Sequence, residues 1–125
     1  MTQILVIDDD DLIRGLLRSV LEKAGYQVLE APDGNVGIEI FREQSADLII
    51  TDILMPEKEG LETIMEIRRE SPDVKIIAIS GGAKVGPFTY LKLAERFGAE
   101  RVFSKPLEMR QLLQAIRELL EEKTT

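Results

Sequence analysis

Short apolar runs alternate along the chain with longer stretches in which apolar residues recur every three or four positions. A short apolar run is typical of a buried strand, whereas recurrence at three and four is typical of one face of an amphipathic helix. The runs predict five strands, at residues 3–7, 26–31, 47–51, 74–80 and 101–104. The recurrences predict five helices, one after each strand.

Capping residues indicate where the helices begin and end. The first helix carries apolar residues from Leu12 to Ala24; Asp11 can cap its start, and Gly25 stands where a helix commonly ends. The second helix begins near Asn35, the third ends near Pro72, and the fourth runs from Pro87 to Gly98. The closing helix has an apolar face formed by Leu112, Leu113, Ile116, Leu119 and Leu120.

Strict alternation of strands and helices predicts an α/β fold. Strands that are apolar throughout indicate a parallel sheet covered on both faces. Right-handed crossovers then give a doubly wound five-stranded parallel sheet with five helices. We expect the flavodoxin-like strand order 2-1-3-4-5 for it. The 125 residues fit one domain, residues 1–125, and no linker or repeat is visible.

Composition excludes several kinds of chemistry. The chain has no cysteine and no histidine, which excludes disulfides, a Ser-His-Asp triad and a His-ligated metal. A bound metal would need oxygen ligands, as magnesium, calcium and manganese prefer.

The net charge of −7 argues against nucleic acid as a direct partner. With no long apolar segment and no signal-peptide pattern, we expect a cytoplasmic protein without a membrane partner.

Polar side chains collect where the predicted strands end. The first strand runs into Asp8, Asp9, Asp10 and Asp11, the third into Asp52, the fourth into Ser80 and the fifth into Lys105. In parallel α/β sheets the carboxyl ends of the strands form the ligand-binding edge, beside the switch in strand order. The first and third strands are neighbours at that switch, so we expect Asp8, Asp9 and Asp52 to lie together.

Three neighbouring carboxylates would raise one another's pKa and destabilise the site unless a cation offsets their charge. Mg²⁺ fits, because it takes one or two carboxylates and leaves room for phosphate oxygens. Asp10 and Asp11 would instead favour the positive end of the first helix. Each feature alone has a simpler interpretation as a solvated loop, a cap or a turn; their convergence on one edge favours a site.

These stretches together resemble the receiver domain of bacterial response regulators. The resemblance covers nearly the whole chain and rests on "VIDDDD", "DLIITDILMPEKEG", "IIAISGG" and "GAERVFSKPL". It implies that Asp52 is the phosphoacceptor, with Ser80 and Lys105 binding the phosphoryl oxygens. It further implies Mg²⁺ held by Asp9 directly, by Asp8 through water, by Asp52 and by the backbone carbonyl of Leu54, and a cis peptide bond before Pro106.

The resemblance also implies partners. A sensor histidine kinase or phosphotransfer protein would supply the phosphoryl group, and a downstream effector protein would read a conformational change. The chain would be no enzyme beyond its own phosphorylation and dephosphorylation, and a monomer or weak dimer. Kinase recognition would involve the first helix, at Leu12, Ile13 and Leu16, and the Pro106–Leu107 turn; we expect Leu12 or Leu16 to be a core residue.

Position 102 is among those that depart from the family pattern. The family often has an aromatic residue three positions before the lysine, and Val102 stands there. Strand alternation should turn the adjacent Phe103 to the other face.

Three alternatives to a stand-alone receiver remain: a flavodoxin-like cofactor carrier, a receiver used only as a scaffold, and a receiver cut from a longer regulator. The acidic run after the first strand disfavours the first, because it would repel a phosphate.

Overall fold

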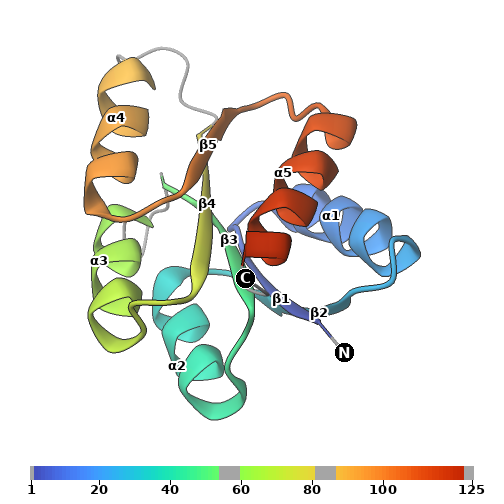
Figure 1. Ribbon diagram of the computed structural model, residues 1–125, viewed down its shortest axis with the longest axis horizontal. Helices are drawn as coiled ribbons and strands as arrows, with labels where there is room; N and C mark the ends of the chain where they lie inside the picture. Colours follow the sequence, from blue (N-terminus) through green and yellow to red (C-terminus); the bar gives the residue numbers. More distant parts are fainter. Residues whose placement is uncertain (1, 54–59, 81–86, 123–125) are drawn as a thin grey trace.

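The computed structural model describes residues 2–53, 60–80 and 87–122. Five parallel strands form one sheet in the order β2-β1-β3-β4-β5, as predicted (Figure 1). The strands are β1 (Gln3–Ile7), β2 (Gln27–Ala31), β3 (Leu48–Asp52), β4 (Lys75–Ser80) and β5 (Arg101–Ser104). The helices are α1 (Asp11–Lys23), α2 (Gly34–Gln44), α3 (Gly60–Glu70), α4 (Pro87–Phe97) and α5 (Met109–Glu122).

Helices cover both faces of the sheet: α1 and α5 lie on one side, and α2, α3 and α4 on the other (Figure 1). Because β1 is pleated, its side chains point alternately to the two faces of the sheet. Ile4 and Val6 pack in the cluster with α1 and α5, whereas Leu5 and Ile7 pack in the cluster with α2, α3 and α4. All four are fully buried, which explains why this strand is apolar without alternation.

The predicted helix ends agree closely with the structure. Gly25, with φ of 97°, follows the cap of α1, and Gly98, with φ of 125°, follows α4. Both angles lie in the left-handed region that glycine adopts without a steric penalty. At α2, the carboxylate of Asp33 accepts a hydrogen bond from the Val36 N–H, so the helix begins at Gly34.

The prediction that Leu12 or Leu16 belongs to the core is wrong. Leu12 is 81% exposed and Leu16 is 48% exposed, while Leu17 and Leu21 of the same helix are fully buried. Ile13 packs at the margin of the cluster beneath α1. The outer side of α1 therefore carries exposed leucines. Among the described helices, none is both long enough and apolar enough to cross a membrane.

Candidate functional site

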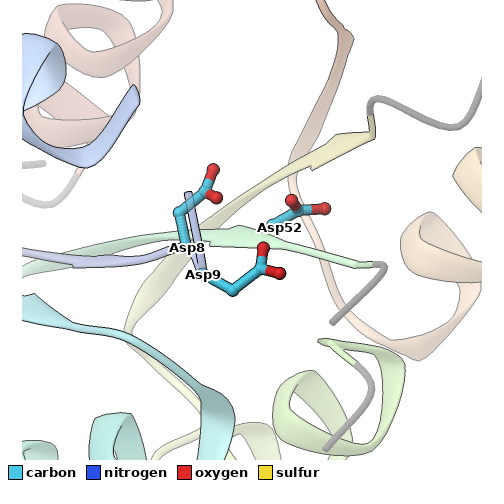
Figure 2. Close-up of side chains that lie close together, drawn as sticks. All are labelled: Asp8, Asp9 and Asp52. Carbon is cyan, nitrogen blue, oxygen red and sulfur yellow. The ribbon is translucent and has the colours of Figure 1, made fainter. Parts of the chain in front are cut away.

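Three aspartates meet at the carboxyl ends of β1 and β3, as predicted. Asp8 and Asp9 follow β1, and Asp52 is the last residue of β3. One carboxylate oxygen from each lies within 4.8 Å of the others. Figure 2 shows the carboxylate of Asp9 directed toward that of Asp52, with Asp8 beside them. Asp8 and Asp52 are buried and Asp9 is exposed, so the cluster opens to solvent on one side.

Side chains of the acidic run organise the turn between β1 and α1. Asp8 Oδ1 accepts a hydrogen bond from the Asp10 N–H at 2.9 Å. Asp10 Oδ1 in turn accepts from the N–H groups of Leu12 at 3.0 Å and Ile13 at 3.3 Å, which makes Asp10 the cap of α1. The prediction that Asp11 caps this helix is therefore wrong by one residue. Asp11 lies in the first turn, where its charge favours the helix dipole.

Lys105 supplies a positive charge to the cluster. Its Nζ lies 3.1 Å from Asp8 Oδ2 and 3.1 Å from Asp52 Oδ2. The Lys105 N–H donates to the Ser80 carbonyl at 2.8 Å, which fixes the backbone of the lysine at the sheet edge. Burial disfavours the ammonium, but Asp52 and Asp8 outweigh burial and raise the pKa of Lys105 above its ordinary value. Lys105 thus stays protonated and offsets part of the aspartate charge.

The surroundings of the Asp8 carboxyl disfavour its negative charge. Burial raises the pKa of the Asp8 carboxyl, and the charge of Asp52 raises it further, against the opposing hydrogen bond from Asp10 and the charge of Lys105. Repulsion from Asp52 thus raises the pKa of Asp8 as predicted, but desolvation is the larger cause. Asp8 Oδ2 is buried and receives no hydrogen bond within the described chain. The Lys105 ammonium contacts it as an ion pair, with Nζ 3.1 Å away.

A buried carboxylate oxygen that has only an ammonium beside it within the described chain, in a cluster of three carboxylates, suits a hard divalent cation. The donor set therefore fits Mg²⁺, with Asp8, Asp9 and Asp52 as the side chains that would hold it. Leu54, whose carbonyl was the fourth predicted ligand, lies outside the described residues.

Ser80 ends β4 at the same edge. In the sheet register Asp52 faces Ile79, so Ser80 stands one position beyond the level of Asp52. Its side chain is buried. This places a hydroxyl, two buried carboxylates and the lysine at one edge, as the sequence predicted. The Lys105–Pro106 peptide bond is cis, which is also as predicted.

Val102 and Phe103 lie on opposite faces of the sheet, as strand alternation predicted. Val102 packs with the cluster beneath α2, α3 and α4, and Phe103 packs with the cluster beneath α1 and α5. The face of β5 that meets α4 therefore carries an aliphatic side chain at position 102.

Sequence reasoning missed two residues that touch the site through the backbone. Arg14 donates a hydrogen bond to the carbonyl of Asp8 at 2.7 Å. Gly60 packs so closely on the end of β3 that a Cβ there would overlap the carbonyl oxygen of Asp52. The sequence signals were weak: an arginine on a helix is usually solvated, and a glycine before a helix has many uses.

Sequence comparison finds known proteins that are similar to this chain over nearly its whole length. The model of the family described as response regulator receiver domain matches residues 4–117. The response regulator receiver protein CpdR of Brucella abortus is 37% identical over 123 residues, covering 96% of this chain and 98% of that protein. The transcriptional regulatory protein CpxR of Klebsiella pneumoniae is 32% identical over 120 residues, or 96% of this chain, which spans 50% of CpxR. The chain spans 12% of the sensor kinase CckA of Brucella abortus, at 34% identity and 95% coverage of this chain.

Solved structures agree with the fold. A CheY-like receiver domain protein from Methanospirillum hungatei superposes with a TM-score of 0.92 at 29% identity, covering 99% of this chain and 97% of that one. The response regulator TrrA of Thermotoga maritima, in complex with Mg(2+)-BeF, superposes with a TM-score of 0.84 at 32% identity. The match covers 95% of this chain and 99% of that one.

Proposed function

Because the chain belongs to the response-regulator receiver domain family of two-component systems, we propose that it is a signalling module controlled by phosphorylation of Asp52. The donor would be a sensor histidine kinase or a phosphotransfer protein. The observation that carries the proposal is the position of Lys105 Nζ, 3.1 Å from both Asp52 Oδ2 and Asp8 Oδ2, beside a cluster that fits a divalent cation.

The arrangement supports phosphoryl transfer to a carboxylate. An Oδ of ionised Asp52 attacks the phosphorus of the donor, and a new P–O bond forms as the bond from phosphorus to the donor breaks. The donor leaves with the bonding electrons and takes a proton from solvent if it is an imidazole. Such a transfer depends mainly on positioning and charge neutralisation. Lys105 supplies a fixed positive charge close to the attacking oxygen.

Mg²⁺ is the cofactor that we propose, held by Asp8, Asp9 and Asp52 and, as the resemblance implies, by the Leu54 backbone carbonyl. When bound, it would neutralise negative charge on the transferring oxygens. The buried Asp8 Oδ2, which has only the Lys105 ammonium beside it within the described chain, supports this assignment, and so does the relative TrrA, which was solved with Mg(2+)-BeF.

The output would be contact with another protein. A phosphoryl group on Asp52 would draw Ser80 and Lys105 toward its oxygens and so shift the segments that follow β4 and β5. We propose a cytoplasmic module with no enzymatic activity beyond its own phosphorylation and dephosphorylation. The net charge of −7 supports a protein effector and no direct nucleic-acid contact.

The start of α1 is the surface that we propose for the phosphodonor. Leu12 and Leu16 are exposed there, directly after the acidic turn that carries Asp8 and Asp9. A donor that packs on these leucines would lie beside the open side of the cluster. Exposed leucines of this kind commonly mark a contact surface when they are grouped.

The deciding experiment is intact-mass measurement after incubation with acetyl phosphate, with and without Mg²⁺. We expect the wild-type protein to gain one phosphoryl group only when Mg²⁺ is present. Asp52→Asn is the matched variant, since it keeps the size of the side chain and removes the nucleophile, and it should gain nothing. An equal gain in both proteins would move the acceptor elsewhere, and no gain in either would favour a scaffold role.

A further inference from the structure

Arg14 joins three elements beside the acidic turn. Its Nη1 donates to the Asp8 carbonyl at 2.7 Å, its Nε to Glu30 Oε1 at 3.1 Å and its Nη2 to Asp11 Oδ1 at 2.5 Å. The three acceptors belong to the turn after β1, to β2 and to the first turn of α1. The Arg14 side chain is only 15% exposed, whereas Asp11 is 86% exposed, so solvent competes least for the bonds to Asp8 and Glu30.

The Asp8 carbonyl belongs to the peptide group that links Asp8 to Asp9. The direction of that peptide group sets where the Asp9 side chain points. The Asp8 N–H is held by the Ala31 carbonyl at 3.1 Å, and the Asp10 N–H by Asp8 Oδ1 at 2.9 Å. The bond from Arg14 fixes the peptide group between these two anchors.

Asp9 lacks a positioning contact of its own. Its side chain is exposed, and within the described chain it forms no hydrogen bond or ion pair. Asp8, in contrast, is held by Asp10 and Lys105, and Asp52 by Lys105. Of the three carboxylates, Asp9 therefore depends most on its backbone for its direction toward Asp52 (Figure 2).

An arginine suits this task better than a lysine would. The guanidinium presents several N–H groups in a rigid plane and can hold acceptors in three directions, whereas an ammonium acts as a compact point charge. Glu30 can anchor the Arg14 guanidinium because Glu30 is itself held in place: its second carboxylate oxygen accepts a hydrogen bond from Arg18 Nη1 at 2.6 Å. Arg18 itself bonds Glu30 and Glu22, which leaves the contact with the acidic turn to Arg14.

We propose that Arg14 is a positioning residue for the cation site: it holds the Asp8–Asp9 peptide group so that the Asp9 carboxylate points at Asp52. This inference rests on the proposed function, because it assigns Arg14 a role in binding the Mg²⁺ that phosphorylation would need. Replacing a residue that does not bind the metal but orients one of its ligands typically weakens metal binding about 10–100-fold.

The test compares Arg14→Lys with Arg18→Lys. Both exchanges keep the charge, lie in the same helix and remove a guanidinium bonded to Glu30, but only Arg14 reaches the Asp8 carbonyl. The readouts are the Mg²⁺ dissociation constant from calorimetric titration with MgCl₂ and the melting temperature without metal. We expect Arg14→Lys to weaken Mg²⁺ binding about tenfold, and Arg18→Lys to leave it within about twofold.

A merely structural role would lower the melting temperature of Arg14→Lys without changing its Mg²⁺ affinity, and that result would overturn the proposal. Equal weakening in the two variants would overturn it as well, because it would indicate a general effect of the ion network. If Arg14→Lys does not fold, Glu30→Gln decides: it leaves Arg14 intact but removes its anchor, so Mg²⁺ binding should weaken in the same direction, and unchanged binding would overturn the proposal.

The wild-type protein separates this inference from the proposed function. Wild-type protein that binds Mg²⁺ and gains a phosphoryl group, while the two lysine variants behave alike, would overturn only the role of Arg14. Wild-type protein that does neither would overturn the proposed function and the role of Arg14 with it.

Discussion

Lys105, directly after β5, reaches past β4 to Asp52 at the end of β3, where Lys105 Nζ lies 3.1 Å from Asp52 Oδ2. The same ammonium lies 3.1 Å from Asp8 Oδ2. In the protein without metal, the lysine thus supplies part of the positive charge that the two buried carboxylates require. A divalent cation bound to the same carboxylates would meet a neighbouring positive charge.

Replacement of Lys105 by Met should therefore separate metal binding from chemistry. Without the ammonium, Mg²⁺ binding should tighten by about tenfold, the size expected for one unit charge a few ångström away in a solvated site. Phosphorylation by acetyl phosphate at saturating Mg²⁺ should nevertheless slow by at least about tenfold, because the transferring oxygens lose a fixed cation. Calorimetry and timed intact-mass measurements give the two values.

Lys23→Met is the control for this change, since it removes the same charge from an exposed site in the last turn of α1. It should alter neither value by more than about twofold. Weaker Mg²⁺ binding in Lys105→Met would show that the lysine supports the cation site instead of competing with it.

Asp9→Asn should have opposite effects on metal binding and on stability. The exchange removes a carboxylate ligand, so Mg²⁺ binding should weaken strongly, by tenfold or more. It also relieves repulsion with Asp8 and Asp52, so the metal-free protein should gain about 0.5–1 kcal/mol in the free energy of unfolding. Urea denaturation in EDTA measures the gain, with Asp73→Asn as a control for net charge. A lower metal-free stability would make Asp9 a structural acceptor.

The position of the site could be predicted from the sequence because parallel strands share a carboxyl edge. Once residues 3–7 and 47–51 were assigned as strands, Asp8, Asp9 and Asp52 had to meet at the point where the strand order reverses. Lys105 and Ser80 followed from the same rule. That Lys105 bridges Asp8 and Asp52 could not be predicted, because a long flexible side chain reaches many partners.

The errors arose where several residues of one type are adjacent. Asp10 and Asp11 are equally good caps by composition, and only the backbone angles at Asp10 decide between them. Leu12, Ile13, Leu16 and Leu17 form two neighbouring apolar stripes, and the periodicity does not say which faces the sheet. The contacts of Arg14 depend on the approach of β2 to α1, which local sequence does not encode.

Glu30 should make stability depend on pH below its ordinary titration range. Hydrogen bonding with Arg18 and Arg14 lowers the pKa of Glu30 below its ordinary value of 4.5, against the effect of burial. A lowered pKa in the folded state means that the stabilisation is complete above about pH 4.5 and is lost as the pH falls through the folded-state pKa. Glu30→Gln should therefore cost about 0.5–1 kcal/mol at pH 7, and progressively less at lower pH.

Urea denaturation of wild type and Glu30→Gln from pH 7 to pH 3 tests this dependence. The difference in the free energy of unfolding should narrow below pH 4.5. A difference that stays constant across this range would mean that the network acts through neutral hydrogen bonds and packing.

Gly15→Ala should stabilise the protein. Gly15 lies inside α1, and a Cβ there would meet no atom within 4 Å. Alanine costs about 1 kcal/mol less than glycine in a helix interior, so the free energy of unfolding should rise by up to about 1 kcal/mol. Thermal and urea denaturation measure the gain. A loss of stability would mean that α1 is distorted at this position, and phosphorylation by acetyl phosphate should be unaffected in either case.

Gly60→Ala should have the opposite outcome, because Gly60 packs on the acceptor strand. Its N–H donates to the Ile53 carbonyl at 3.2 Å, and a Cβ there would overlap the Asp52 carbonyl oxygen and lie 2.9 Å from the Asp52 carbonyl carbon. Backbone atoms cannot rotate away, so α3 or the end of β3 has to shift, at a cost of about 1–3 kcal/mol. Such a shift moves Asp52 relative to Lys105 and should slow phosphorylation by acetyl phosphate.

Gly15→Ala is the matched control for Gly60→Ala, since both add one methyl group to a helical glycine, one in open space and one against the site. Timed intact-mass measurements at saturating Mg²⁺, below the melting temperature of each variant, should show a rate several-fold lower for Gly60→Ala alone. A destabilised Gly60→Ala that is phosphorylated at the wild-type rate would mean that α3 absorbs the displacement. In that case Gly60 would serve the packing of α3 on the sheet and would leave the acceptor in place.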